Sequence, residues 1–148
     1  MQLIGFNFTK IHAEKFPDFK LSGMNTHIEF TNVEKEDVPF IKDAETYKLS
    51  FNYTLTYGEN SQEKEKKKSK IYGEISFQGV VLAKLEKDES KDLLKFWKKK
   101  QLLPQMVMPL YNFILKRCSA KAFILEEDVN LPFHLQIPQL KNQPKSPD

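Results

Sequence analysis

Strict alternation of apolar and polar residues marks residues 47–57 as the clearest element of the chain. The apolar positions are Tyr47, Leu49, Phe51, Tyr53, Leu55 and Tyr57. Polar residues stand between them, which predicts a strand with one face in a core and the other in water. Such strands are typical of antiparallel sheets covered on one side, because strands of a parallel sheet wrapped on both sides are apolar throughout.

Three weaker strands surround this one in the sequence. A strand from about Lys70 carries Ile71, Ile75 and Phe77 on one side. Gly79 interrupts its pattern, and the apolar run after Gly79 predicts a bulge or bend. The other two strands precede residue 47, and each has an apolar face made of Ile4, Phe6 and Phe8 in the first and Met24, Ile28 and Phe30 in the second.

After Leu85 the apolar period becomes helical. A short lysine-rich helix opens near Asp88 or Ser90, and a stronger one runs from Met106 to about Ala122, with regular turns from Met108 or Pro109. The apolar stripe of the second helix is wider than one packing face needs, which predicts that this helix packs on two surfaces. Two prolines make residues 131–138 extended, and residues 142–148 form a polar tail. We expect a single domain over residues 1–141.

Composition indicates a soluble domain with one core, since 40% of the 148 residues are hydrophobic and 12% are aromatic. Lys and Arg outnumber Asp and Glu only 23 to 20, an excess too small to choose a partner. The single Cys118 excludes an intramolecular disulfide and a thiolate zinc cluster. No stretch approaches a membrane span, and residues 1–10 lack the features of a signal peptide, so we expect a cytoplasmic protein.

Catalytic patterns are not found. None of His12, His27 and His134 pairs with another at the spacing of a helical metal site, and the five glycines are too scattered to cradle a phosphate. Cys118 lies on the apolar stripe of the predicted long helix, which indicates a buried thiol rather than a nucleophile. We therefore expect no enzyme activity, no metal and no cofactor.

Two lysine runs keep a nucleic-acid or polyanion binder open as an alternative. They are residues 66–68 and 98–100, and the second adjoins Phe96 and Trp97, which could stack on bases. Glutamates near the first run reduce its net positive charge, and the strand aromatics lie on the face that we expect to be buried in the core. Nucleic acid is therefore the less favoured partner.

Three segments together resemble the SecB family of export chaperones, especially its diverged members outside the proteobacterial export pathway. In Leu103–Tyr111 two prolines five residues apart enclose an apolar run, as at the start of the family's long helix. Leu131–Pro138 is similar to the family's crossover loop, and residues 8–14 are similar to its first strand with an offset of one residue.

The resemblance implies an α+β fold, with one four-stranded antiparallel sheet and helices packed on one face. It implies a homotetramer, built as a dimer of dimers with the long helices at its centre. It also implies an ATP-independent holdase that binds unfolded client polypeptides in apolar grooves. The helix residues assigned to the oligomer interface are Met106, Val107, Leu110, Ile114 and Cys118. The residues assigned to client contacts are Ile4, Phe6, Phe8, Pro132, Phe133, Leu135, Ile137 and Pro138.

The chain also departs from the family. The family's second helix has no counterpart after the crossover loop, and Ala122–Asn130 reads as an insertion before that loop. The family's outer sheet face is acidic and docks the export motor, whereas Lys48, Ser50 and Asn52 stand here, so docking to that motor is not expected. Export, a toxin–antitoxin system and general protein quality control stay open as roles. For each loop residue the alternative is that it merely caps the core, and for the whole chain it is an oligomer whose assembly consumes the apolar surface.

Overall fold

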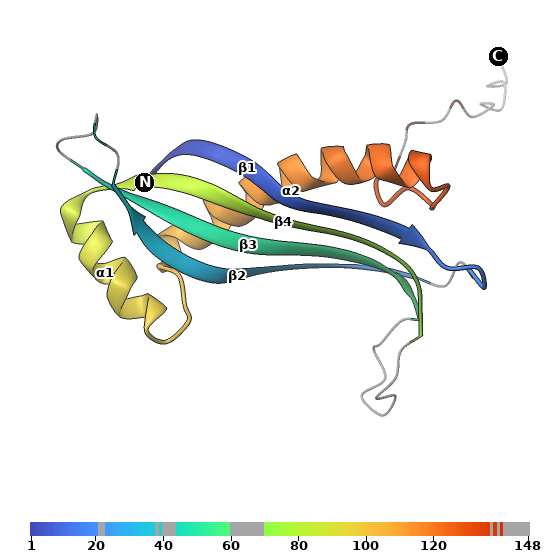
Figure 1. The fold of residues 1–148 in the computed structure, drawn as a ribbon, viewed down its shortest axis with the longest axis horizontal. Helices are drawn as coiled ribbons and strands as arrows, with labels where there is room; N and C mark the ends of the chain where they lie inside the picture. The colour runs from blue at the N-terminus through green and yellow to red at the C-terminus, as the bar shows by residue number, and fades with distance from the viewer. Residues whose placement is uncertain are drawn as a thin grey trace, which may run out of the picture.

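Four long strands form one antiparallel sheet, with two helices on one of its faces (Figure 1). The computed structural model describes residues 1–20, 23–37, 39, 44–59, 70–136, 138 and 140. The strands are β1 (Gln2–Lys15), β2 (Met24–Glu36), β3 (Glu45–Gly58) and β4 (Ile71–Leu85), and the helices are α1 (Lys87–Trp97) and α2 (Pro104–Asp128). The sheet order is β1-β4-β3-β2, so β1 and β2 are the edges. The predicted fold class is confirmed.

Strand β3 lies inside the sheet, and its alternation is the one predicted from the sequence. Its six inward side chains, Tyr47 to Tyr57 at every second position, are at most 1% exposed. The residues between them are half-buried on the opposite, polar face. Because both helices cover the first face only, a period of two in the sequence becomes one dry and one wet surface.

Two of the four register shifts in the sheet lie next to Gly79, although β4 itself runs unbroken through this residue. Gly79 pairs with Phe8 in β1 and with Phe51 in β3. The ladder shifts register just beyond Phe8 in β1, and also in β2 just beyond the partner of Phe51. A Cβ atom at Gly79 would lie 2.7 Å from the ring of Phe51. The predicted irregularity therefore belongs to the two edge strands, and Gly79 is small because Phe51 occupies its side-chain space.

Helix α2 is longer at both ends than the sequence pattern predicted. It begins at Pro104, where a proline costs no hydrogen bond, and Pro109 lies in its second turn. At its other end, residues 122–128 of the segment predicted as an insertion continue the helix. Its fully buried residues follow a strict spacing of four: Met106, Leu110, Ile114, Cys118, Ala122 and Glu126. Such a ridge is inclined to the helix axis, which lets a straight helix cross a twisted sheet.

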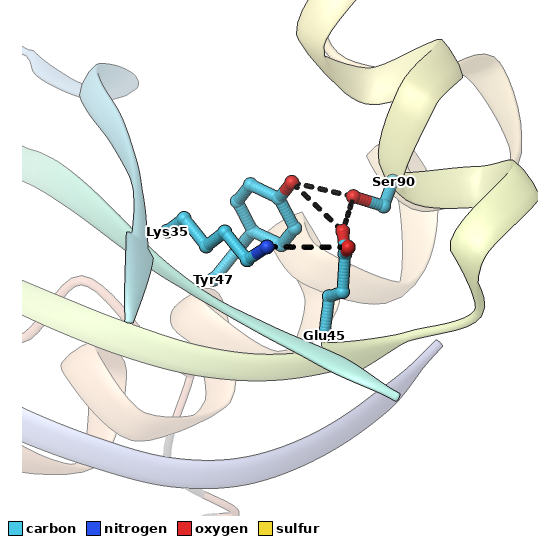
Figure 2. A network of polar contacts seen from close by, with 4 residues as sticks. All are labelled: Lys35, Glu45, Tyr47 and Ser90. Atoms are coloured by element: carbon cyan, nitrogen blue, oxygen red, sulfur yellow. Dashed lines mark hydrogen bonds and ion pairs between the residues drawn. The ribbon is translucent and has the colours of Figure 1, made fainter. Parts of the chain in front are cut away.

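A polar network fixes α1 to the end of the sheet (Figure 2). Ser90, on the buried side of α1, donates a hydrogen bond to the carboxylate of Glu45, and its Oγ lies 2.5 Å from the hydroxyl of Tyr47. Lys35 of β2 forms a 3.2 Å ion pair with the same carboxylate. The pKa of Glu45 is lowered below its ordinary value, mainly by the hydrogen bond from Ser90 and next by the one from Lys35. Helix α1 begins at Lys87, one residue before the predicted start.

Candidate functional site

Many large apolar side chains remain exposed on this fold, and several of them surround α2. An apolar side chain in water is common singly, but a cluster beside a groove is typical of a binding surface. Exposed large apolar residues in the helices, the strands and the segment after α2 include Ile4, Ile11, Met24, Leu94, Phe96, Met108, Leu115, Ile124, Phe133 and Leu135.

One groove lies between the edge strand β1 and the flank of α2, and we call it the β1–α2 groove. Its volume is about 540 Å³. It is lined by Phe8, Phe113, Lys116, Arg117, Ala120, Lys121 and Ile124. The ring of Phe113, a lining residue, packs against that of Phe6 with centroids 5.6 Å apart, and the Arg117 guanidinium lies 5.6 Å from each centroid. An apolar floor with a cationic rim suits an amphipathic ligand.

A second groove, here the β2–helix groove, lies between the edge strand β2 and the junction of the two helices. Its volume is about 690 Å³. Aromatic rings from three elements contribute to its wall, with Phe30 from β2, Phe96 and Trp97 from α1, and Tyr111 from α2. Val107, which was assigned to the oligomer interface, also lines it. The sequence assigned no client contacts here, because its lining comes from three segments whose proximity only the fold creates.

The extended segment after α2 presents two of its predicted contact residues to solvent. Phe133 is 38% exposed and Leu135 is 47% exposed. One face of Phe133 stacks on Phe123 of α2, with ring centroids 4.4 Å apart. Pro132 is half-buried and Pro138 is exposed, whereas Ile137 lies outside the described residues.

A buried carboxylate anchors this segment to the end of α2. Glu126 is 0% exposed and accepts a hydrogen bond from the hydroxyl of Tyr57 in β3. The backbone N–H of His134 donates to the same carboxylate at 2.8 Å, and the Nδ1 atom of His134 lies 2.5 Å from it. The pKa of Tyr57 is raised, mainly by burial and next by the hydrogen bond to the Glu126 carboxylate. Asn130 reverses the chain in the left-handed conformation, with φ of 58°, which asparagine tolerates.

Of the predicted contacts on β1, Ile4 and Phe6 lie toward the other end of the sheet, whereas Phe8 pairs with Gly79 near the middle of β4 and lines the β1–α2 groove. Phe6 is half-buried in an aromatic cluster, with its ring 5.6 Å from that of Phe51, and Ile4 is exposed at a register shift. Lys15, at the opposite end of β1, is the residue that reaches the loop, because its Nζ donates to the Asn130 carbonyl at 3.1 Å. The fold therefore does not gather Ile4 and Phe133 in one patch. Helix α2 joins the two regions, since Ile124 in the β1–α2 groove adjoins Phe123 in sequence.

The helix residues assigned to the oligomer interface lie mostly inside this chain. Met106, Leu110, Ile114 and Cys118 are 0% exposed because they pack on the chain's own sheet. These four side chains have no surface left to offer another subunit. An interface made by α2 would have to use its outward side, where Met108 is 67% exposed and Leu115 is also exposed.

The described residues offer little for catalysis. Burial raises the pKa of the Cys118 thiol to about 12, as expected for a structural cysteine. No group of three or more His, Cys, Asp or Glu side chains in the described part of the chain could hold a metal ion. Within the same residues, neither helix is both long enough and apolar enough to cross a membrane.

The two lysine runs differ in what the structure shows. The first, residues 66–68, lies outside the described residues. In the second, Lys98, Lys99 and Lys100 are exposed, but the Nζ atom of Lys100 covers the Trp97 ring at 4.9 Å from its centroid. Trp97 therefore does not offer that face to a nucleic-acid base.

The chain matches no known family profile and no curated protein, and its likeness to solved structures is confined to the fold. Among those structures is the SecB-like chaperone Rv1957 of Mycobacterium tuberculosis, in complex with a ChAD peptide from the Rv1956 HigA1 antitoxin. The identity is 11% and the TM-score is 0.47, and the match covers 96% of this chain and 91% of the other.

Proposed function

We propose that the protein is an ATP-independent holdase of the SecB-like type, which binds extended, unfolded client polypeptides through apolar grooves in the cytoplasm. The observation that carries this proposal is the pair of grooves on either side of α2, each of several hundred Å³ and each beside an edge strand. Two separate apolar grooves suit a long flexible chain better than a compact small molecule.

The chemistry of the exposed side chains supports the same proposal. Methionine and aromatic side chains adapt to many partner shapes, because a thioether is flexible and a ring offers a flat face. Met24 and Phe96 are such residues, and both are exposed. Weak contacts along a client add up through effective concentration, so a holdase needs neither a deep pocket nor a nucleotide.

Suppression of client aggregation tests the proposal. The purified protein should prevent aggregation of a chemically denatured substrate in the absence of nucleotide. The double variant Phe133→Asp with Leu135→Asp should lose most of this activity, because two buried charges would replace two apolar contacts in the complex. The variant Gln136→Asp is the matched control, since Gln136 is exposed and polar in the same segment. Unchanged suppression in the double variant would contradict the assignment of the loop residues.

The assembly belongs to the proposal as well. We infer a homotetramer with α2 at its centre, as the sequence resemblance implies, and we assign its contact to the outward residues Met108 and Leu115. Native mass measurement should then give a tetramer, and Leu115→Asp should dissociate it. A monomeric native particle with full holdase activity would contradict this part of the proposal alone.

A further inference from the structure

The rim of the β1–α2 groove is positively charged on one side. Lys116, Arg117 and Lys121 lie on α2 one turn apart or adjacent, and all three line the groove. No acidic residue is part of its lining. The groove therefore has a local charge of one sign beside an apolar floor, whereas lysines and arginines exceed acidic residues only 23 to 20 over the whole chain.

These cations have no acidic partner in the described part of the chain. The ion pairs there join other lysines to carboxylates, for example Lys35 to Glu45 and Lys70 to Asp18. Arg117 lies over the rings of Phe6 and Phe113, is exposed, and forms no ion pair or side-chain hydrogen bond with the described residues, so its N–H groups can meet a ligand. A guanidinium held in this way is pre-organised, so less side-chain entropy is lost when a carboxylate binds it.

We propose that the β1–α2 groove selects client segments in which carboxylates flank apolar or aromatic side chains. The inference rests on the proposed holdase function and specifies its substrate class. The apolar side chains of the client would contact Phe8, Phe113 and Ile124, and its carboxylates would pair with the cations of the rim. Complementary charge of this kind favours the right partner mainly by speeding its encounter and penalising partners of the wrong sign.

Two other occupants fit the groove less well. A second copy of this chain, related by a two-fold axis through the groove, would bring the same cations face to face, which is unfavourable. A nucleic acid would supply phosphates, but its bases would need open ring faces. The lining ring of Phe113 packs against Phe6 and lies under Arg117, and the lining ring of Phe8 packs against Phe6 and Phe77, so both rings are already engaged in contacts within the chain.

Three labelled peptides test the selectivity directly. They share the same apolar residues and the same length, and their flanking residues are all Glu, all Gln or all Lys. Fluorescence anisotropy with the full-length protein should show the Glu peptide binding about tenfold more tightly than the Gln peptide, the effect of three partly exposed ion pairs. The Lys peptide should bind most weakly, and the preference should shrink at higher salt.

A charge-matched pair of variants localises the effect. The groove variant carries Lys116→Gln, Arg117→Gln and Lys121→Gln, and it should bind all three peptides equally. The control variant carries Lys91→Gln, Lys95→Gln and Lys98→Gln in and just after α1, which removes the same charge from exposed positions elsewhere. The control should keep the preference of the unmodified protein.

The remaining outcomes separate this inference from the function on which it rests. Equal affinity for the three peptides in the unmodified protein would overturn the charge selectivity while leaving the holdase proposal intact. Absence of binding, together with no suppression of aggregation, would overturn both. Displacement of the Glu peptide by a single-stranded oligonucleotide of equal charge, at equal or lower concentration, would show a general polyanion site and overturn the peptide assignment.

Discussion

The Nδ1 atom of His134 lies 2.5 Å from the carboxylate of Glu126, eight residues earlier in the chain. Both side chains are more than nine-tenths buried. The contact closes the turn between α2 and the extended segment, so it fixes the position of the segment that carries Phe133 and Leu135. A buried carboxylate is costly without donors, and here Tyr57 and the backbone of His134 supply the others.

Glu126→Ala should lower the free energy of unfolding by about 2–4 kcal/mol, since it leaves a buried hydroxyl unpaired and opens a cavity. Urea denaturation measures this loss. The backbone amide of His134 should also exchange with solvent faster in this variant. Glu127→Ala, at an exposed neighbouring position, is the control and should change stability by less than about 0.5 kcal/mol. Equal effects of the two substitutions would refute the anchoring role of Glu126.

Gly79→Ala should destabilise the fold by about 1–3 kcal/mol, because the added methyl group would meet the Phe51 ring and a backbone carbonyl at 2.7 Å. Gly5→Ala is the matched substitution in the same sheet. Its Cβ would lie 3.1 Å from the flexible end of Leu82, which can move aside. In thermal or urea unfolding, Gly79→Ala should therefore have a clearly lower free energy of unfolding than Gly5→Ala. The reverse ranking would show that the sheet tolerates a side chain beneath Phe51.

The Glu45 network makes part of the stability dependent on pH. The pKa of Glu45 is lower in the folded protein than its ordinary value of 4.5, chiefly because Ser90 donates to the carboxylate. Ionised Glu45 therefore stabilises the fold above the unfolded-state pKa, and this contribution is lost as the pH falls through the folded-state pKa. Ser90→Ala should raise the pKa of Glu45, as read from an NMR titration of its side chain. Ser76→Ala on the polar sheet face should leave it unchanged, and a shift of the same size there would argue against a direct hydrogen bond.

Cys118 should resist thiol reagents until the protein unfolds, because the thiolate is the reactive form and burial raises the thiol pKa to about 12. The comparison is Ala120→Cys in a Cys118→Ala background, since Ala120 is exposed two residues further along α2. Rapid labelling at both positions in native conditions would mean that α2 separates readily from the sheet.

Local pattern was sufficient to predict the elements whose two faces differ. The alternation from Tyr47 to Tyr57 predicted β3 because one face of the sheet is dry and the other is wet. Pairing order and register could not be read in this way. The need for glycine at position 79 depends on the Phe51 ring, which lies in another strand, and a single-strand pattern carries no record of that contact.

The end of α2 was missed for a related reason. The buried ridge continues at a spacing of four from Cys118 through Ala122 to Glu126, but its last member is charged and so broke the apolar pattern. The spacing of four, taken without regard to residue type, was the signal that could have extended the predicted helix to Glu126. The β2–helix groove carried no such signal, because Phe30 and Trp97 are far apart in the sequence.

The central claim, that this protein holds unfolded chains by burying their apolar side chains, is tested most directly by calorimetric titration with a permanently unfolded polypeptide at several temperatures. The account predicts saturable binding without nucleotide and a negative heat-capacity change, while the folded form of the same polypeptide does not bind. Absence of binding, or binding with no heat-capacity change, would contradict it.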